Sequence, residues 1–292
     1  MPVEAPWFGV GIPASVTPLR KEADEVIIDR LFGQAGTSRR QFLGAAAAVV
    51  SATALDAGPL TAQVLSHAIK AVAFDAFAIF DARPVFRLVE EIFPGRGTEL
   101  SNQWRTRQFE YTWLRNSMRQ YTDFWHVTED ALNYAAKQSG VRLNPEQSMR
   151  LMSAYLQLKP WPDVAAVVQI LQKQGLRLAL LTNWTPAMME ACLNGSGLEA
   201  MFELQLSTDR VNVFKPDPAA YQMGLDAFHL QKQEIAFVAF GGWDAVGAKA
   251  FGYPTYWVNR SSVPAEELGV SADATDQDLS HLPSFIDSLR RV

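Results

Sequence analysis

The chain has 292 residues, 48% of them hydrophobic, and a formal net charge of -5 at pH 7. That much apolar material supports one large α/β domain, with or without a smaller inserted domain, and excludes a mainly disordered protein. The acidic balance, with charges of both signs mixed along the chain, leaves no basic face for nucleic acid.

A paired arginine precedes a short apolar stretch near the amino terminus. Arg39 and Arg40 are followed by an alanine- and valine-rich stretch that ends near residue 55, which is too short to span a bilayer. This pattern resembles a bacterial twin-arginine export signal. We therefore predict a leader extension over residues 1–36 and an export signal with its linker over residues 37–69. The mature protein would then be periplasmic, with no membrane segment; an ordinary alanine-rich helix there would leave it cytoplasmic.

Short β-type runs alternate with helical patterns from residue 70 onward, which is typical of a parallel sheet flanked by helices. The predicted strands are residues 71–74, 176–181, 204–207, 235–240 and 255–258. The predicted helices between them are residues 186–193, 218–228 and 244–251.

One block interrupts this alternation. The pattern there predicts successive helices around residues 100–121, 124–139 and 145–156. We therefore predict an α/β fold whose core is a Rossmann-like parallel sheet, formed by residues 70–84 and 159–292. A helical cap domain, residues 85–158, is inserted after the first strand.

Polar residues follow three of the predicted strands. Asp75 comes directly after the first strand, Asn183 follows the second, and Trp243 and Asp244 follow the fourth. Because ligands gather at the carboxyl ends of parallel strands, we expect these residues to lie at one edge of the sheet. A carboxylate there, such as Asp75, can attack carbon or phosphorus, although an aspartate that only caps a loop has the same local pattern.

The other reactive side chains predict no further site. Cys192 is the single cysteine, which excludes a disulfide framework and a cysteine-cluster metal site, and its apolar neighbours predict a buried thiol. The four histidines, His67, His126, His229 and His281, are scattered without metal-ligand spacing. We expect them to be structural or surface residues, and we predict no metal site.

Four short motifs lie next to the predicted strand ends. They are Phe74-Asp75-Ala76-Phe77, Leu181-Thr182-Asn183, Val213-Phe214-Lys215-Pro216-Asp217 and Trp243-Asp244-Ala245-Val246-Gly247-Ala248. Their order resembles that of the haloacid dehalogenase superfamily. The strings at residues 94–97, 104–115 and 128–132 resemble the cap domain of its L-2-haloacid dehalogenase branch. The resemblance extends from about residue 70 to residue 292 and implies the haloacid dehalogenase fold.

The resemblance implies a hydrolase that acts at C2 of a small 2-substituted carboxylic acid. An aspartate displaces the leaving group, forms a covalent ester and is released by water, without a metal or other cofactor. Phosphatases of the superfamily carry a second aspartate two residues after the nucleophile to hold magnesium, whereas this chain has Phe77, whose ring cannot bind a hard cation. A magnesium-dependent small-molecule phosphatase is therefore the less favoured alternative.

Carried over residue by residue, the resemblance assigns four catalytic roles. Asp75 would be the nucleophile, and Lys215 would hold it ionised by direct charge pairing. Asp244 would pair with Lys215 and position the attacking water. Arg105 would lie over the leaving group and stabilise its charge. Without the resemblance, a surface ion pair for Arg105 and a solvated loop position for Lys215 would be the default interpretations.

The resemblance also implies a substrate pocket. Thr182 would bind the substrate carboxylate, and Asn183 would hold the leaving group. Aromatic residues would form the walls, namely Phe77, Phe109, Phe124, Trp184, Phe240 and Trp243. The expected partners are the small acid and water. Dehalogenases of this branch are often dimers. The apolar residues of the cap helices are compatible with a homodimer.

The sequence departs from the branch pattern at three places near the nucleophile. Residues 77–81 form a stretch that is one residue short and lacks a threonine, residues 239–242 replace an expected serine and asparagine, and Trp184 replaces a glycine. The missing polar groups weigh slightly against ordinary dehalogenation.

Three functions stay open at this point. They are 2-haloacid dehalogenation, ring opening of azetidine-2-carboxylate to 2-hydroxy-4-aminobutyrate, and a catalytically dead small-acid binding protein. An aromatic pocket suits the leaving nitrogen of azetidine-2-carboxylate at least as well as a halide. The retained nucleophile and its cationic partner favour an active hydrolase over a binding protein.

Overall fold

The structure, a computed structural model, describes residues 68–290. The predicted leader extension, and the predicted export signal up to residue 67, lie outside the described residues. Within residues 68–290, no helix has the length and apolar character needed to cross a membrane.

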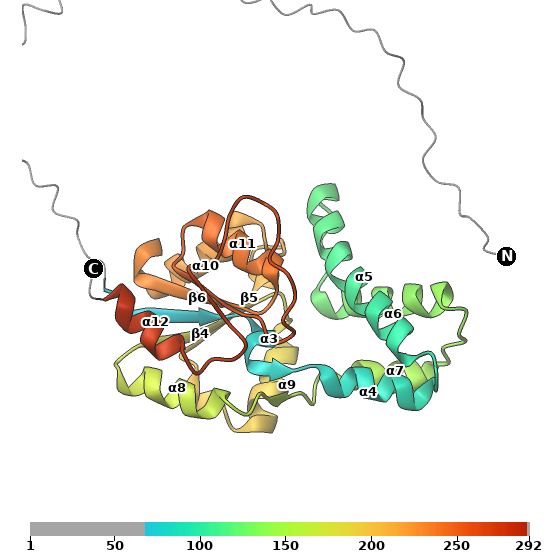
Figure 1. The fold of residues 1–292 in the computed structure, drawn as a ribbon. Helices are drawn as coiled ribbons and strands as arrows, with labels where there is room; N and C mark the ends of the chain where they lie inside the picture. The colour runs from blue at the N-terminus through green and yellow to red at the C-terminus, as the bar shows by residue number, and fades with distance from the viewer. Residues whose placement is uncertain (1–67, 291–292) are drawn as a thin grey trace, which may run out of the picture. The chain divides into compact units, whose positions relative to one another are not determined.

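A six-stranded parallel sheet forms the core (Figure 1). In spatial order its strands are β5 (Leu204–Ser207), β4 (Arg177–Thr182), β1 (Ala71–Phe74), β6 (Ile235–Ala239), β7 (Thr255–Val258) and β8 (Ala274–Asp276). Every residue of β1 is buried between β4 and β6, which explains why this strand is apolar at each position instead of alternating. The predicted fold class is confirmed.

The five predicted strands correspond to β1, β4, β5, β6 and β7, and their ends shift by at most one residue. The sequence pattern does not mark β8. That strand has three residues, Ala274–Asp276, none of them fully buried, and it lies at the edge of the sheet, where burial imposes no apolar pattern.

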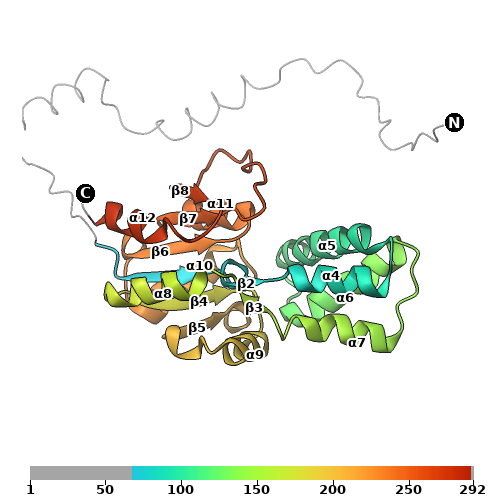
Figure 2. The same cartoon turned by 60° about the horizontal axis from the view of Figure 1, so that its bottom comes forward.

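Helices cover both faces of the sheet (Figure 2). One face carries α8 (Val164–Lys173), α9 (Pro186–Ser196) and α12 (Leu282–Leu289). The other carries α10 (Pro218–Phe228) and α11 (Gly242–Phe251). Neighbouring strand residues such as Val72 and Ala73 alternate between the two apolar clusters, as the period of a strand requires. The predicted helices correspond to α9, α10 and α11; α8 and α12 are additional.

The chain leaves the sheet after β1 and returns to it before β4. The segment between these two strands is an insertion. Its connection to the sheet consists of α3 (Ala76–Ile79) and the antiparallel pair of β2 (Phe80–Asp81) and β3 (Lys159–Pro160). The inserted helices are α4 (Arg83–Ile92), α5 (Gly97–Met118), α6 (Phe124–Gln138) and α7 (Pro145–Ala154).

Side-chain caps define where two of the inserted helices begin. Asp123 caps α6, and Asn144 forms a capping box with Gln147 at the start of α7. The helical insertion after the first strand is confirmed, and α4 extends it to Arg83. The boundaries of the cap domain at residues 85 and 158 stay predictions.

Candidate active site

Asp75 is the first residue after β1, and its carboxylate is fixed by the local backbone. The residue caps α3, since Oδ2 accepts a hydrogen bond from the backbone N–H of Phe77 at 3.0 Å. Its own N–H donates to the carbonyl oxygen of Val238 in β6 at 2.9 Å. The side chain is 10% exposed. The carboxylate is thus held at the carboxyl edge of the sheet while a small molecule can still reach it.

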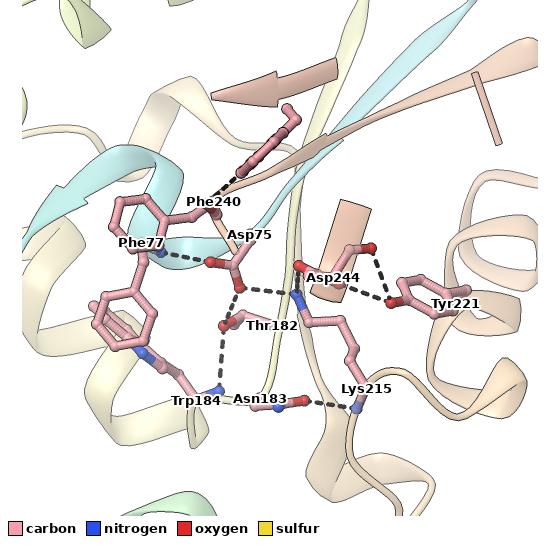
Figure 3. Close-up of polar contacts among 10 residues, drawn as sticks. Asp75, Phe77, Thr182, Asn183, Trp184, Lys215, Tyr221, Phe240 and Asp244 are labelled. Carbon is pink, nitrogen blue, oxygen red and sulfur yellow. Dashed lines mark hydrogen bonds and ion pairs between the residues drawn. The ribbon is translucent and has the colours of Figure 1, made fainter. Parts of the chain in front are cut away.

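Lys215 lies between two carboxylates (Figure 3). Its Nζ donates to Oδ1 of Asp75 at 2.8 Å and to Oδ2 of Asp244 at 2.6 Å, and its side chain is fully buried. Its backbone N–H donates to Oδ1 of Asn183 at 2.9 Å, which ties the loop before α10 to the loop after β4. Burial by itself lowers the pKa of Lys215, but the charges of Asp244 and Asp75 raise it above the ordinary value. The ammonium therefore stays charged.

Asp244 lies in the first turn of α11 and is buried beside Lys215. Burial raises the pKa of Asp244; the charge of Lys215 opposes this shift, and the charge of Asp75 adds to it. Oδ1 of Asp244 accepts a hydrogen bond from the hydroxyl of Tyr221 at 2.7 Å. The sequence pattern gives no role to Tyr221, because only the fold shows that it is buried on the side of α10 that faces the sheet.

A pocket of about 220 Å³ opens at Asp75. All the residues predicted to bind substrate line it, namely Phe77, Phe109, Phe124, Thr182, Asn183, Trp184, Phe240 and Trp243. Arg105 lines the pocket as well. Lys215 and Asp244 do not line it; Lys215 contacts Asp75 from within the core, and Asp244 contacts Lys215. The structure thus brings together every residue that the sequence predicted for the site.

Three buried N–H groups of pocket-lining residues have no acceptor within residues 68–290. They are Nδ2 of Asn183, Nε1 of Trp184 and Nε of Arg260. The hydroxyl of Thr182 donates to Oδ1 of Asp75 at 3.5 Å and accepts from the backbone N–H of Trp184 at 3.3 Å. A buried donor without a partner costs about 1–3 kcal/mol. The pocket therefore suits a ligand that carries acceptor or anionic groups.

Arg105 reaches the pocket from α5 of the insertion. The residue is exposed, and its side chain makes no hydrogen bond or ion pair with any residue that the structure describes. Its neighbour Arg107 does form the surface ion pair that the helix pattern suggests, with Glu110 at 2.7 Å. The guanidinium of Arg105 is thus available to an anionic group in the pocket.

Aromatic rings from the core and the insertion meet around the nucleophile. The ring centroid of Phe77 lies 5.1 Å from that of Trp184 and 6.3 Å from that of Phe109 in α5. Phe109 in turn lies 5.3 Å from Trp243. Such walls keep bulk water away from Asp75 and strengthen electrostatic interactions in the pocket.

Comparison with known proteins places the chain in a family. Residues 53–252 match the model of the haloacid dehalogenase-like hydrolases. The chain belongs to this family. It is 41% identical to an (S)-2-haloacid dehalogenase of Pseudomonas sp. (strain YL) over 206 residues, which cover 70% of this chain and 89% of the relative. It is 39% identical to haloacetate dehalogenase H-2 of Moraxella sp. (strain B) over 208 residues, or 71% and 93% of the two chains.

Solved structures give the same result. The L-2-haloacid dehalogenase of Xanthobacter autotrophicus with covalently bound chloropropionic acid superposes with a TM-score of 0.69 at 32% identity, covering 75% of this chain and 98% of that one. This haloacid dehalogenase-like hydrolase is therefore an enzyme of the 2-haloacid dehalogenase type.

The loop after β7 adds pocket residues that the sequence motifs did not mark. Arg260 is nearly buried, and its guanidinium pairs with both carboxylate oxygens of Asp163 at 3.0 Å. Asn259, Ser261 and Glu266 also line the pocket of this hydrolase. The topology offered a signal, because this loop leaves the same carboxyl edge of the sheet as Asp75.

The cysteine and the three histidines within residues 68–290, His126, His229 and His281, do not line the pocket of this hydrolase. Cys192 is a buried free cysteine, and burial raises the pKa of its thiol to about 11, as expected of an unreactive core thiol. His126 and His281 are exposed and lie beside Asp123 and Asp276. His67 lies outside the described residues.

Proposed function

We propose that this hydrolase cleaves the carbon–halogen bond at C2 of small (S)-2-haloacids, with Asp75 as the nucleophile. The observation that carries the proposal is the carboxylate of Asp75, which is paired with the buried Lys215 at 2.8 Å and faces a small pocket with unpaired N–H donors. The names of the similar dehalogenases support the substrate class. The chloropropionic acid covalently bound in the Xanthobacter enzyme supports a covalent intermediate.

In the first step, an oxygen of Asp75 attacks C2 from the side opposite the halogen. A bond forms between that oxygen and C2, the C2–halogen bond breaks, and the halide leaves with the bonding electrons. Arg105 and Nδ2 of Asn183 are unpaired donors that would stabilise the halide, and the hydroxyl of Thr182 would turn from Oδ1 of Asp75 to hold the substrate carboxylate. The attack inverts the configuration at C2.

In the second step, water attacks Cγ of the Asp75 ester. Asp244 takes a proton from the water and passes it to the departing oxygen of the 2-hydroxy acid, while the bond between Cγ and that oxygen breaks. Asp75 regains its carboxylate with one oxygen from water. The products are one halide, one proton and the (R)-2-hydroxy acid.

The decisive assay incubates the purified protein with (S)- and (R)-2-chloropropionate in separate reactions. We expect equal amounts of chloride and (R)-lactate from the (S) substrate. A single turnover in ¹⁸O-labelled water should place the label in Asp75 before it reaches lactate. Label that passes directly into lactate, with none in the protein, would contradict the covalent scheme.

The same assay separates the remaining alternatives. A chelator should leave the rate of chloride release unchanged. Hydrolysis of phosphate monoesters that a chelator stops and magnesium restores would favour the phosphatase. Binding of 2-haloacids without release of chloride would favour the catalytically dead binding protein.

Ring opening of azetidine-2-carboxylate is a second candidate, supported by one feature of the pocket. The carboxylate of Glu266 lines the same pocket as the rings of Phe109 and Trp243. A carboxylate and aromatic faces attract the protonated ring nitrogen, which would leave C2 as an amine. The test is formation of 2-hydroxy-4-aminobutyrate from the L enantiomer, and the ratio of kcat/KM for the two substrates ranks the two activities.

We further propose export to the periplasm through the paired arginines. Arg39 and Arg40 ahead of an alanine-rich stretch support this proposal. Residues 1–69, fused to a reporter protein, should direct it to the periplasm of a bacterium with a twin-arginine system. Replacing both arginines by lysine should retain the fusion in the cytoplasm, and export of that variant would contradict the proposal.

A further inference from the structure

The segment that joins β6 to α11 borders the pocket without any hydrogen-bonding side chain. Phe240, Gly241 and Gly242 line the pocket directly before Trp243 and Asp244. The two carboxylate oxygens of Asp244 are already engaged, by Lys215 at 2.6 Å and by Tyr221 at 2.7 Å. An ionised carboxylate only accepts hydrogen bonds, so a donor to a water beside Asp244 has to come from another residue.

Gly241 is not required by the backbone. Its φ of -83° and ψ of 140° form an extended conformation that any residue adopts. What excludes a side chain there is the indole of Trp243, because a Cβ on Gly241 would lie 2.7 Å from Nε1 and 3.1 Å from Cδ1 of that ring. The N–H edge of the indole thus occupies the place of the side chain that residue 241 lacks.

The indole of Trp243 is held in this place from two directions. Its ring centroid lies 5.3 Å from that of Phe109, which also lines the pocket, and 5.6 Å from that of Trp113. The N–H makes no hydrogen bond with any residue between 68 and 290. A residue that lines the pocket, one position before Asp244, therefore carries an N–H donor without a partner among the described residues.

We infer that the indole N–H of Trp243 positions the water that hydrolyses the Asp75 ester, in place of a side chain at residue 241. This inference rests on the proposed function. The water accepts a hydrogen bond from Nε1 with one lone pair and donates one to Asp244. Its other lone pair forms the bond to Cγ of Asp75, the bond from Cγ to the substrate oxygen breaks, and the proton taken by Asp244 passes to that oxygen. The N–H of Trp243 then acts in the second step alone, while its ring stays part of the pocket wall in both steps.

The test separates the two chemical steps in the variant Trp243→Phe, which keeps an aromatic ring and removes only the N–H edge. With (S)-2-bromopropionate we expect a burst of one bromide per active site at the wild-type rate, followed by turnover that is slower by about 100-fold. Intact mass spectrometry should show the ester, seen as one carboxyethyl group on the protein, accumulating during turnover. If bromide release slows as much as turnover, or no ester accumulates, the inference is overturned.

A second variant covers the case in which Trp243→Phe does not fold. Gly241→Ala removes no group, yet its Cβ has to displace the indole, so the same accumulation of ester is expected. Wild-type hydrolysis of the ester in a folded Gly241→Ala variant would overturn the inference. Trp113→Phe is the matched control, because Trp113 packs on the indole of Trp243 and its replacement by Phe leaves the N–H of Trp243 in place. If the wild-type protein itself releases no halide, the proposed function fails instead.

Discussion

On the core side of the pocket, the charges of Asp75, Lys215 and Asp244 are buried and paired with one another, whereas on the cap side the guanidinium of Arg105 is exposed and unpaired. The core side is organised before any ligand binds, because each charge already has its partner there. The cap side has a cation without a partner until an anion enters. Changes in the core charges should therefore reduce both folding stability and activity, and changes at Arg105 should reduce activity alone.

The largest effect is expected for Asp75→Asn. An amide is nearly isosteric with the carboxylate but is a poor nucleophile, so halide release should fall by roughly 10⁴-fold or more. Circular dichroism should show a native fold. Turnover within tenfold of the wild-type rate would show that Asp75 is not the nucleophile, and it would contradict the catalytic role of the core side of the pocket.

Lys215→Met tests the stability of the buried charges. It leaves Asp75 and Asp244 close together without a cation, and we expect the free energy of unfolding at pH 7 to fall by about 3–5 kcal/mol, measured by urea denaturation. The matched control is Lys249→Met, which removes a surface pair with Asp273 at 2.6 Å and should cost at most about 1 kcal/mol. Equal losses in the two variants would show that burial of Lys215 has no special weight.

Arg105→Gln tests the cap side. We expect the rate of halide release to fall by about 100-fold, because a fixed cation near the leaving group is lost. The free energy of unfolding should change by at most about 0.5 kcal/mol, since the guanidinium has no partner in the described residues. A large loss of stability would contradict the comparison between the two sides.

The pH profile gives the smallest and most specific effect. Burial raises the pKa of Asp244 to about 6, so activity should fall as the pH drops through that value, because a protonated Asp244 cannot accept a proton from water. The hydrogen bond from Tyr221 lowers this pKa. Tyr221→Phe should therefore move the acid limb of kcat, measured where hydrolysis of the ester limits turnover, to higher pH. An unmoved limb would mean that another group controls it.

Much of the architecture could be predicted from local pattern. The apolar runs of β1, β4 and β6 could be recognised in the sequence because strands buried on both faces need apolar residues at nearly every position. Asp75 and Asn183 could be placed at the same sheet edge because parallel strands share a direction. The edge strand β8 could not be predicted, since its exposed residues carry no such pattern.

By itself the sequence determined the elements, their order and the residues at the strand ends, because those depend on the spacing of apolar and polar side chains along the chain. Only the tertiary structure decided which side chains meet. The contact of Tyr221 with Asp244, the approach of Glu266 to the pocket and the indole of Trp243 in the place of a side chain on Gly241 depend on how loops and helices pack. The physical reason is that such contacts are set by side-chain volume and direction in three dimensions, which local periodicity does not encode.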